Sequence, residues 1–349
     1  MKNRKQLSDR RSVLRGAAAA FVGAAMAATA LGTPARAQDA QDYLLATAST
    51  GGTYYPVGVA LATLVKVKLQ PKDKINMSAI NSAGSGENVK LIREDEAQFA
   101  ILQGLYGAYA AKGTGPLAND GPQEHLRSIT MLWPNVEHFI VKKEFAKSGT
   151  ISDMMEVKGK SVGLGAKNSG TLGSNKTILG NLGIDIEKDY ELMYAGYGPS
   201  ADAMQNGQVD AISTPAGPPV GAVSKLFATM ADQVTLLSFT PEQTKQANGD
   251  FEDLWVPFTV KGGTYPGLDT DVTTVAQPNF LAVRDSVPEE TVYKITKTIY
   301  ENLAFLQGIH KATSAMSLES AIAGLPVKLH PGAIRYYEEA GVTIPDRLK

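Results

Sequence analysis

Short apolar runs alternate with helical patterns along most of this chain. Residues 43–48 form an apolar run that predicts a strand. Behind it, Val57, Leu61, Leu64 and Val65 recur at the three- and four-residue spacing of a buried helix face. Alternation of this kind indicates an α/β protein with mainly parallel sheets, each flanked by helices.

Several of the predicted strands run into a loop rich in Gly, Ser and Thr and then into a helix. In open parallel sheets, ligands bind beyond the carboxyl ends of the strands, where helix N-termini expose unpaired N–H groups. One such loop is also typical of an ordinary strand–helix connection, so their recurrence at equivalent places is what favours a binding site. The loops are residues 49–55, 81–85, 165–171, 195–200 and 213–219.

Local signals predict where several helices begin and end. Pro56 suits the first position of a helix, because its missing N–H would have no partner there. Ser85 is a good N-cap for the next helix. One long amphipathic helix is predicted over residues 288–306, and a short final helix over residues 331–340.

The chain is long enough for two lobes. Roughly 310 residues follow the first 37, a length that favours two lobes over one compact domain. The helix–turn–strand unit that ends at Gln103 resembles the unit that ends at Thr214, which suggests lobes of similar topology. The expected boundaries are 38–138 together with 278–349 for one lobe and 139–277 for the other.

The first 37 residues predict an export signal that is cleaved. A basic start precedes an Ala-rich apolar run over residues 16–32, and Ala35 and Ala37 supply the small-x-small pattern of a signal-peptidase site. The run is short for a membrane span, so we expect cleavage after Ala37 rather than a retained anchor. Arg10 and Arg11 resemble a twin-arginine signal, although paired arginines also occur in ordinary Sec signals. The expected location is the periplasm.

The signal conceals an acidic mature chain. Residues 1–37 carry seven Lys/Arg and one Asp, which leaves 27 basic and 34 acidic residues and a net charge of −7. That charge argues against nucleic acid or an anionic membrane surface as a partner. No remaining arginine lies in a Gly-rich loop, so backbone N–H groups and hydroxyls must hold an anionic ligand, with Lys167 as an additional candidate. Those arginines are Arg93, Arg127, Arg284, Arg335 and Arg347.

Motifs for catalysis, cofactors and metals are poor. The chain has no cysteine, which removes thiol nucleophiles, disulfides and thiolate metal sites. Residues 170–177 faintly resemble a phosphate-binding loop, but Asn175 stands where glycine must precede the lysine. The four histidines have no metal-ligand spacing, and no Gly-x-Ser-x-Gly elbow occurs. We therefore predict that the protein is no enzyme and uses no cofactor or metal.

Seven segments of the mature chain carry a family signature: residues 45–58 (LATASTGGTYYPVG), 82–91 (SAGSGENVKL), 98–103 (QFAILQ), 162–171 (VGLGAKNSGT), 207–211 (GQVDA), 278–283 (PNFLAV) and 330–341 (HPGAIRYYEEAG). In this order they resemble the TAXI family, the extracytoplasmic solute receptors of TRAP transporters. The first segment is specific for this family. The other segments are weak individually, and it is their order along the chain that supports the resemblance. The resemblance covers nearly the whole mature chain.

The resemblance implies a type II periplasmic-binding-protein fold whose two lobes close around a ligand. It also implies delivery to a membrane permease driven by an ion gradient. The implied ligand is a small carboxylate, either glutamate-like or a C4 or C5 dicarboxylate. Residues 174–177 are polar, which departs from the family pattern. The positions that match the family's binding loops are Thr50, Gly51, Gly52, Thr53, Tyr54, Tyr55, Ser85, Asn88, Gln103, Ser169, Gly170, Thr171, Pro215, Gly217 and Pro218.

Three alternatives stay open at this point. The same fold could serve an ABC importer or a membrane sensor, it could carry an exported enzyme, or the protein could be purely structural. The loops do not distinguish aspartate, glutamate, 2-oxoglutarate, malate and succinate from one another. A monomer is expected for a freely diffusing receptor.

Overall fold

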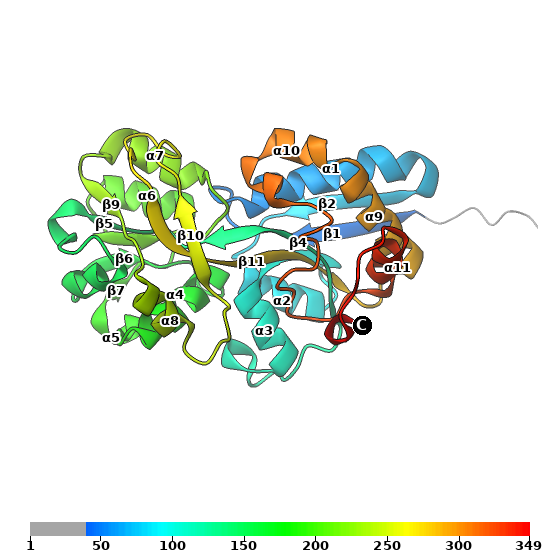
Figure 1. Cartoon of the computed structure of the whole chain (residues 1–349), viewed down its shortest axis with the longest axis horizontal. Helices are drawn as coiled ribbons and strands as arrows, with labels where there is room; N and C mark the ends of the chain where they lie inside the picture. The colour runs from blue at the N-terminus through cyan, green and yellow to red at the C-terminus, as the bar shows by residue number, and fades with distance from the viewer. Residues whose placement is uncertain (1–39) are drawn as a thin grey trace, which may run out of the picture. The chain divides into compact units, whose positions relative to one another are not determined.

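The computed structural model describes residues 40–349, and the predicted export signal at residues 1–37 lies outside them. Within the described residues, the strands form two separate sheets with helices around each (Figure 1). The predicted α/β class is confirmed. We call the elements that surround the two sheets the first and the second lobe.

The first sheet consists of β1 (Gln41–Ala46), β2 (Ile75–Ile80), β3 (Phe99–Gln103), β4 (Leu126–Val136), β10 (Val256–Val260) and β11 (Val272–Arg284). Its strand order is β10–β11–β3–β1–β2, and β4 also pairs with β11. Strand β1 is parallel to β2 and β3. Strand β11 is antiparallel to β3, β4 and β10.

The second sheet consists of β5 (Phe139–Lys142), β6 (Ser161–Gly163), β7 (Glu191–Leu192), β8 (Ala211–Ser213) and β9 (Val234–Leu236), in the order β7–β6–β8–β5–β9. Strand β6 is parallel to β7 and β8, whereas β5 is antiparallel to β8 and β9. Each sheet thus has a central strand between two parallel neighbours and then an antiparallel strand, so the predicted similarity of topology is confirmed. The sheets are mixed rather than mainly parallel, because β11 and β5 enter them antiparallel.

Helices pack around both sheets. The predicted stripe of Val57, Leu61, Leu64 and Val65 is buried on the first of them. The α-helices are α1 (Tyr54–Asp73), α2 (Ser85–Arg93), α3 (Gly104–Lys112), α4 (Gly170–Asn181), α5 (Ile186–Asp189), α6 (Tyr197–Gln205), α7 (Gly221–Met230), α8 (Pro241–Asn248), α9 (Glu289–Glu301), α10 (Leu303–Ile309) and α11 (Pro331–Glu339). Short 3₁₀ helices occupy Gly115–Leu117, Lys143–Phe145, Ile151–Val157, Lys311–Ala315 and Asp346–Leu348.

Buried apolar side chains form one cluster in the first lobe and two in the second. In β5, Phe139 and Val141 belong to one cluster of the second lobe, and Ile140 belongs to the other. Successive side chains of a strand point to opposite faces, so both faces of the second sheet are covered. This explains why β5 is a continuous apolar run rather than an alternating one.

The chain passes from one sheet to the other over a short distance. Strand β4 ends at Val136, and β5 begins at Phe139. Strand β10 pairs with β11 of the first sheet, but Val260 at its end packs in a cluster of the second lobe. Strand pairing therefore assigns β10 to the first lobe, whereas side-chain packing assigns its end to the second lobe. The lobe boundaries at residues 138 and 277 stay a prediction.

Two helices start differently from the predictions. Helix α1 begins at Tyr54, so Pro56 is its third residue rather than its first. A proline is tolerated there because the N–H groups of the first turn have no partner within the helix. Helix α2 has Gly84 as its N-cap, and Ser85 is its first residue. The Ser85 hydroxyl instead accepts the backbone N–H of Gln103 at 3.1 Å.

The single long helix predicted over residues 288–306 is wrong. The structure has α9 and α10, separated at Asn302, whose backbone leaves the helical region. Its side chain donates to the Thr298 carbonyl at 2.8 Å, a local bond that competes with the helix backbone. The final helix predicted over residues 331–340 is confirmed as α11.

Candidate ligand-binding cleft

A cavity lies between the two lobes, beyond the carboxyl ends of their parallel strands. The loops after β1 and β2 and the end of β3 line one side, and the loops after β6, β7 and β8 line the other. The empty volume is about 470 Å³, but the centre of a water molecule reaches only about 30 Å³ of it. That space holds about one or two waters. The lobes are therefore close together, and a larger molecule enters only if they separate.

The structure brings together most of the residues that the sequence predicts for the site. The loops named for the first lobe and the loop before α4 meet at this cavity. The predicted residues that line it are Gly52, Thr53, Tyr54, Ser85, Gln103, Ser169, Gly170, Thr171 and Pro215.

Asn88 lies beneath the cavity rather than in its lining. Its side-chain amide donates to the carbonyls of Thr47 at 2.8 Å and Ile101 at 2.9 Å. Its oxygen accepts the hydroxyl of Ser82 at 2.6 Å. Asn88 thus joins the ends of β1 and β3, which holds two of the lining loops in place.

The other predicted residues lie near the cavity without lining it. Gly217 and Pro218 line a different hollow, beside Trp133. The Gly51 carbonyl accepts the N–H of Ala222 at 3.1 Å, which joins the lobes at the cleft edge. Thr50 is exposed, and Tyr55 is half-buried in the first turn of α1. The Lys167 ammonium lies 5.0 Å from the centre of the Tyr194 ring and is outside the lining.

Tyr197 and Asn135 are among the lining residues that were not predicted for the site. Tyr197 begins α6, and a Gly-rich loop before a short helix was a usable signal for it. Asn135 lies inside the long strand β4, where nothing in the sequence distinguishes it from a structural side chain. Pairing of β4 with β11 is what carries it to the cavity.

Four helices begin at this cavity. The first residues of α1, α2, α4 and α6 are Tyr54, Ser85, Gly170 and Tyr197, and all four line it. Each helix has at least nine residues. Helix N-termini carry unpaired N–H groups and partial positive charge, so their convergence favours an anion.

Two tyrosines supply neutral hydroxyls to the cavity wall. The Tyr54 hydroxyl donates to the side-chain oxygen of Asn279. The Tyr197 hydroxyl donates to the Pro215 carbonyl at 2.6 Å and lies 2.8 Å from the Thr171 hydroxyl. Burial raises the pKa of both tyrosines well above the usual value, so both remain protonated donors at neutral pH.

Direct hydrogen bonds cross the cleft. The Gln103 amide donates to the Gly170 carbonyl at 2.9 Å and to the Ser174 hydroxyl at 3.0 Å. The Thr53 hydroxyl donates to the Gly217 carbonyl at 2.7 Å. These bonds require the lobes to be close, because each joins one lobe to the other.

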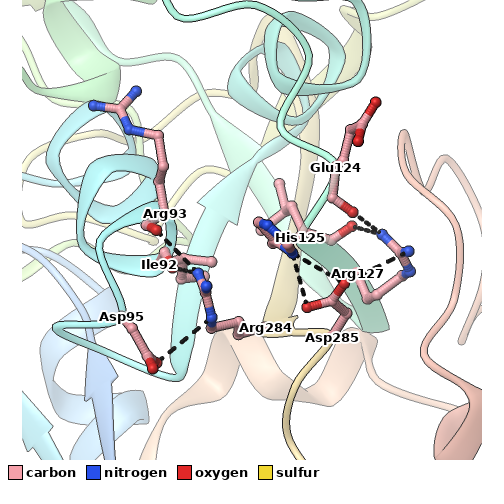
Figure 2. Close-up of polar contacts among 9 residues, drawn as sticks. Ile92, Arg93, Asp95, Glu124, His125, Arg127, Arg284 and Asp285 are labelled. Atoms are coloured by element: carbon pink, nitrogen blue, oxygen red, sulfur yellow. Dashed lines mark hydrogen bonds and ion pairs between the residues drawn. The ribbon is translucent and has the colours of Figure 1, made fainter.

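No charged side chain lines the cavity within residues 40–349. Three arginines, Arg93, Arg127 and Arg284, lie near one another in the first lobe and outside the cavity lining (Figure 2). There Arg93 pairs with Asp120 at 2.6 Å, and Arg284 donates to the carbonyls that end α2. Arg127 donates to the Glu124 carbonyl at 2.6 Å. These three guanidinium groups therefore bond to partners outside the cavity lining.

Two titratable groups are buried where the chain passes from β4 to β5. Burial raises the pKa of Glu137 to about 8, although Trp255 donates to it at 3.1 Å. Burial lowers the pKa of His138 to about 4. The ring of His138 lies 2.8 Å from both the Val136 carbonyl and the Tyr265 hydroxyl. Both groups are therefore mainly uncharged near pH 7.

Metal-ligand clusters and membrane-spanning helices are both absent from residues 40–349. Among them, no cluster of three or more His, Asp or Glu side chains is placed to hold a metal ion. In that same part of the chain, every helix is too short or too polar to cross a membrane.

Comparison with known proteins places the chain in a family. The model of the NMT1-like family matches residues 45–341, which is most of the chain. The chain belongs to the NMT1-like family. The match begins within β1 and ends just after α11, so it spans both lobes of this NMT1-like protein.

Solved structures with a similar fold include three bacterial proteins. A protein of Bordetella bronchiseptica RB50 is 17% identical with a TM-score of 0.51, over 87% of this chain and 85% of that one. The periplasmic aliphatic sulphonate binding protein SsuA from Escherichia coli is 14% identical, with a TM-score of 0.43. The match covers 89% of this chain and 96% of that one. A TctC solute binding protein from Polaromonas is 16% identical, with a TM-score of 0.43. That match covers 78% of this chain and 87% of the other. The NMT1-like chain has the type II periplasmic-binding-protein fold that its topology indicates.

Proposed function

We propose that this protein is an extracytoplasmic solute receptor that binds a small carboxylate between its lobes. The convergence of four helix N-termini on one uncharged cavity carries the proposal. Hydroxyls of Ser85 and Ser169 line the same space and can donate to carboxylate oxygens. The ligands favoured are glutamate-like compounds and C4 or C5 dicarboxylates.

Closure of the lobes explains how an uncharged cavity holds an anion. When the lobes meet, water leaves and each N–H···O bond becomes stronger in the lower dielectric. A ligand that contacts both lobes stabilises the closed state by its differential affinity. The permease then distinguishes loaded from empty receptor by the distance between the lobes.

The lining supports binding rather than catalysis. Within the described residues, its hydroxyls lie beside no His, Lys, Asp or Glu in the cavity that could act as a base. Glu137 and His138 are buried and lie outside the lining of the cavity. The proposal therefore assigns no reaction to this site.

The transport system and the location complete the proposal. The family segments support a TAXI-type receptor that delivers its ligand to an ion-gradient-driven TRAP permease. The sequence of residues 1–37 supports export to the periplasm, by the twin-arginine route, before cleavage after Ala37. The receptor acts as a monomer, with residues 38–138 and 278–349 in one lobe and 139–277 in the other.

A thermal-shift screen of residues 38–349 tests the proposal. The panel contains mono- and dicarboxylates, amino acids, sugars, sulfonates and phosphate. A ligand present at about 100 times its dissociation constant should add about 2.7 kcal/mol and raise the Tm by several degrees. A response confined to carboxylates supports the proposal. A response to sugars or cations alone, or no response in protein stripped of co-purified ligand, contradicts it.

Two variants locate the response. Ala83→Phe places a large ring in the cavity lining and should abolish the shift. Ala111→Phe makes the same change on the exposed side of α3 and should keep it. Equal shifts in both variants would mean that the carboxylate binds elsewhere.

A further inference from the structure

Asn135 is a buried lining residue with a side-chain oxygen that lacks a hydrogen-bond partner. The residue is 1% exposed. A buried acceptor without a donor is unfavourable, because it has lost its water without replacement. Asn135 lies in the cavity lining, so a bound molecule is in a position to supply the missing donor.

The orientation of the Asn135 amide follows from its neighbours. The Gly170 carbonyl can only accept, so the group that Gln103 places 2.9 Å from it must be the side-chain NH₂. The Gln103 oxygen therefore faces Asn135 and accepts from the Asn135 NH₂ at 3.4 Å. This chain of bonds leaves the Asn135 oxygen, and not its NH₂, as the group without a partner.

We infer that Asn135 selects carboxylates that carry a neutral hydrogen-bond donor, a 2-hydroxy group, beside the carboxylate. The inference rests on the proposed function, in which the helix N-termini hold the carboxylate. An unpaired acceptor in the wall requires a donor on the ligand, and a plain dicarboxylate has none. An ammonium is also a donor, but the lining within residues 40–349 contains no carboxylate to balance its charge. A hydroxyl satisfies Asn135 without that cost.

Matched ligands test the inference by isothermal titration calorimetry on residues 38–349. One set is malate, succinate and aspartate, and the other is 2-hydroxyglutarate, glutarate and glutamate. Within each set the carbon chain and the two carboxylates are constant, and only the group on the second carbon changes. The 2-hydroxy member should bind at least about tenfold more tightly than the unsubstituted one, and more tightly than the amino acid.

Two leucine variants distinguish a specificity role from a structural one. Asn135→Leu removes the acceptor at nearly constant volume, so the affinity ratio of hydroxy to plain dicarboxylate should fall to about one. Asn175→Leu is the matched control: Asn175 is also fully buried with an unpartnered side-chain oxygen, but it lies outside the lining. It should keep the parent ratio.

The outcomes separate the inference from the proposed function. If succinate and glutarate bind the parent protein as tightly as their hydroxy analogues, Asn135 is satisfied by water, and the inference is overturned while the receptor function stands. An equal fall in the ratio for both leucine variants also overturns it. If the parent binds no carboxylate, the proposed function fails, and the inference fails with it. The parent comparison decides the question even if Asn135→Leu does not fold.

Discussion

The side chain of Gln103 donates to the carbonyl of Gly170 across the cleft, at 2.9 Å. Gln103 ends β3 in the first lobe, and Gly170 begins α4 in the second. The two residues are 67 positions apart and belong to different lobes. This bond therefore forms only when the lobes are close, and it links lobe closure directly to the residues around the cavity.

Replacing Gln103 should favour separation of the lobes. Gln103→Leu removes the hydrogen bonds to Gly170 and Ser174, which costs about 1–3 kcal/mol in the closed state. We expect a larger radius of gyration by small-angle X-ray scattering. Gln246→Leu, on an exposed face of α8, is the control and should match the parent. A closed Gln103→Leu protein would show that other contacts suffice.

A single methyl group at Gly86 should also hinder closure. A Cβ there would lie 2.4 Å from the backbone oxygen of Asn168 in the other lobe. Overpacking of this size costs about 1–3 kcal/mol, so Gly86→Ala should weaken ligand binding about 5- to 150-fold by calorimetry.

Gly180→Ala is the matched control for Gly86→Ala. Gly180 lies within α4, and a Cβ there meets no atom within 4 Å. Alanine should stabilise this helix by about 0.5–1 kcal/mol in urea unfolding and leave affinity unchanged. Unchanged affinity in Gly86→Ala would mean that the Asn168 loop moves aside without cost.

Glu137 should make the protein less stable as the pH rises. Burial raises its pKa from 4.5 to about 8 in the folded protein. Because the pKa is raised, the contribution of Glu137 to the free energy of unfolding is complete below about pH 4.5. That contribution is lost as the pH rises through about 8. The free energy of unfolding of the parent should therefore fall, relative to Glu137→Gln, between these values. Urea titrations at pH 5 and pH 8.5 measure it, and parallel pH profiles for the two proteins would contradict the assignment.

His138 should act in the opposite direction. Burial lowers its pKa from 6.5 to about 4, so its contribution is complete above about pH 6.5 and is lost as the pH falls through about 4. The variant His138→Gln cannot titrate and should lack this part of the acid sensitivity. Unfolding measured by circular dichroism at pH 6.5 and pH 4.5 compares the two proteins, and equal losses of stability would disprove the prediction.

Arg284 should stabilise the end of α2. Its guanidinium donates to the carbonyls of Ile92 and Arg93, which have no partner within the helix, and its side chain is 15% exposed (Figure 2). Arg284→Met should lower the free energy of unfolding by about 1–3 kcal/mol. Arg335→Met removes an exposed ion pair with Glu290 and should cost less than about 1 kcal/mol. Equal losses of unfolding free energy for the two variants in urea titrations would show that the bonds to the α2 carbonyls stabilise the protein no more than an exposed ion pair does.

Local features of the sequence predicted several of the elements and the loops that line the cavity. The apolar stripe of α1 depends on residues a few positions apart, so spacing alone predicts it. The same local reasoning failed over residues 288–306. A polar side chain bonded to its own backbone at Asn302 ends the helix there, and the apolar periodicity continues past it.

That strands lead into Gly/Ser/Thr loops and helix N-termini can be predicted from residue order, because those signals are encoded within short windows. Which groups meet in space depends on the folded arrangement. The pairing of β4 with β11 carries Asn135 to the cavity, and lobe closure gives Gln103 its partners at Gly170 and Ser174. Whether a buried polar atom is satisfied depends on neighbours far away in the chain. For that reason the unpaired oxygen of Asn135 could not be predicted from the order of residues.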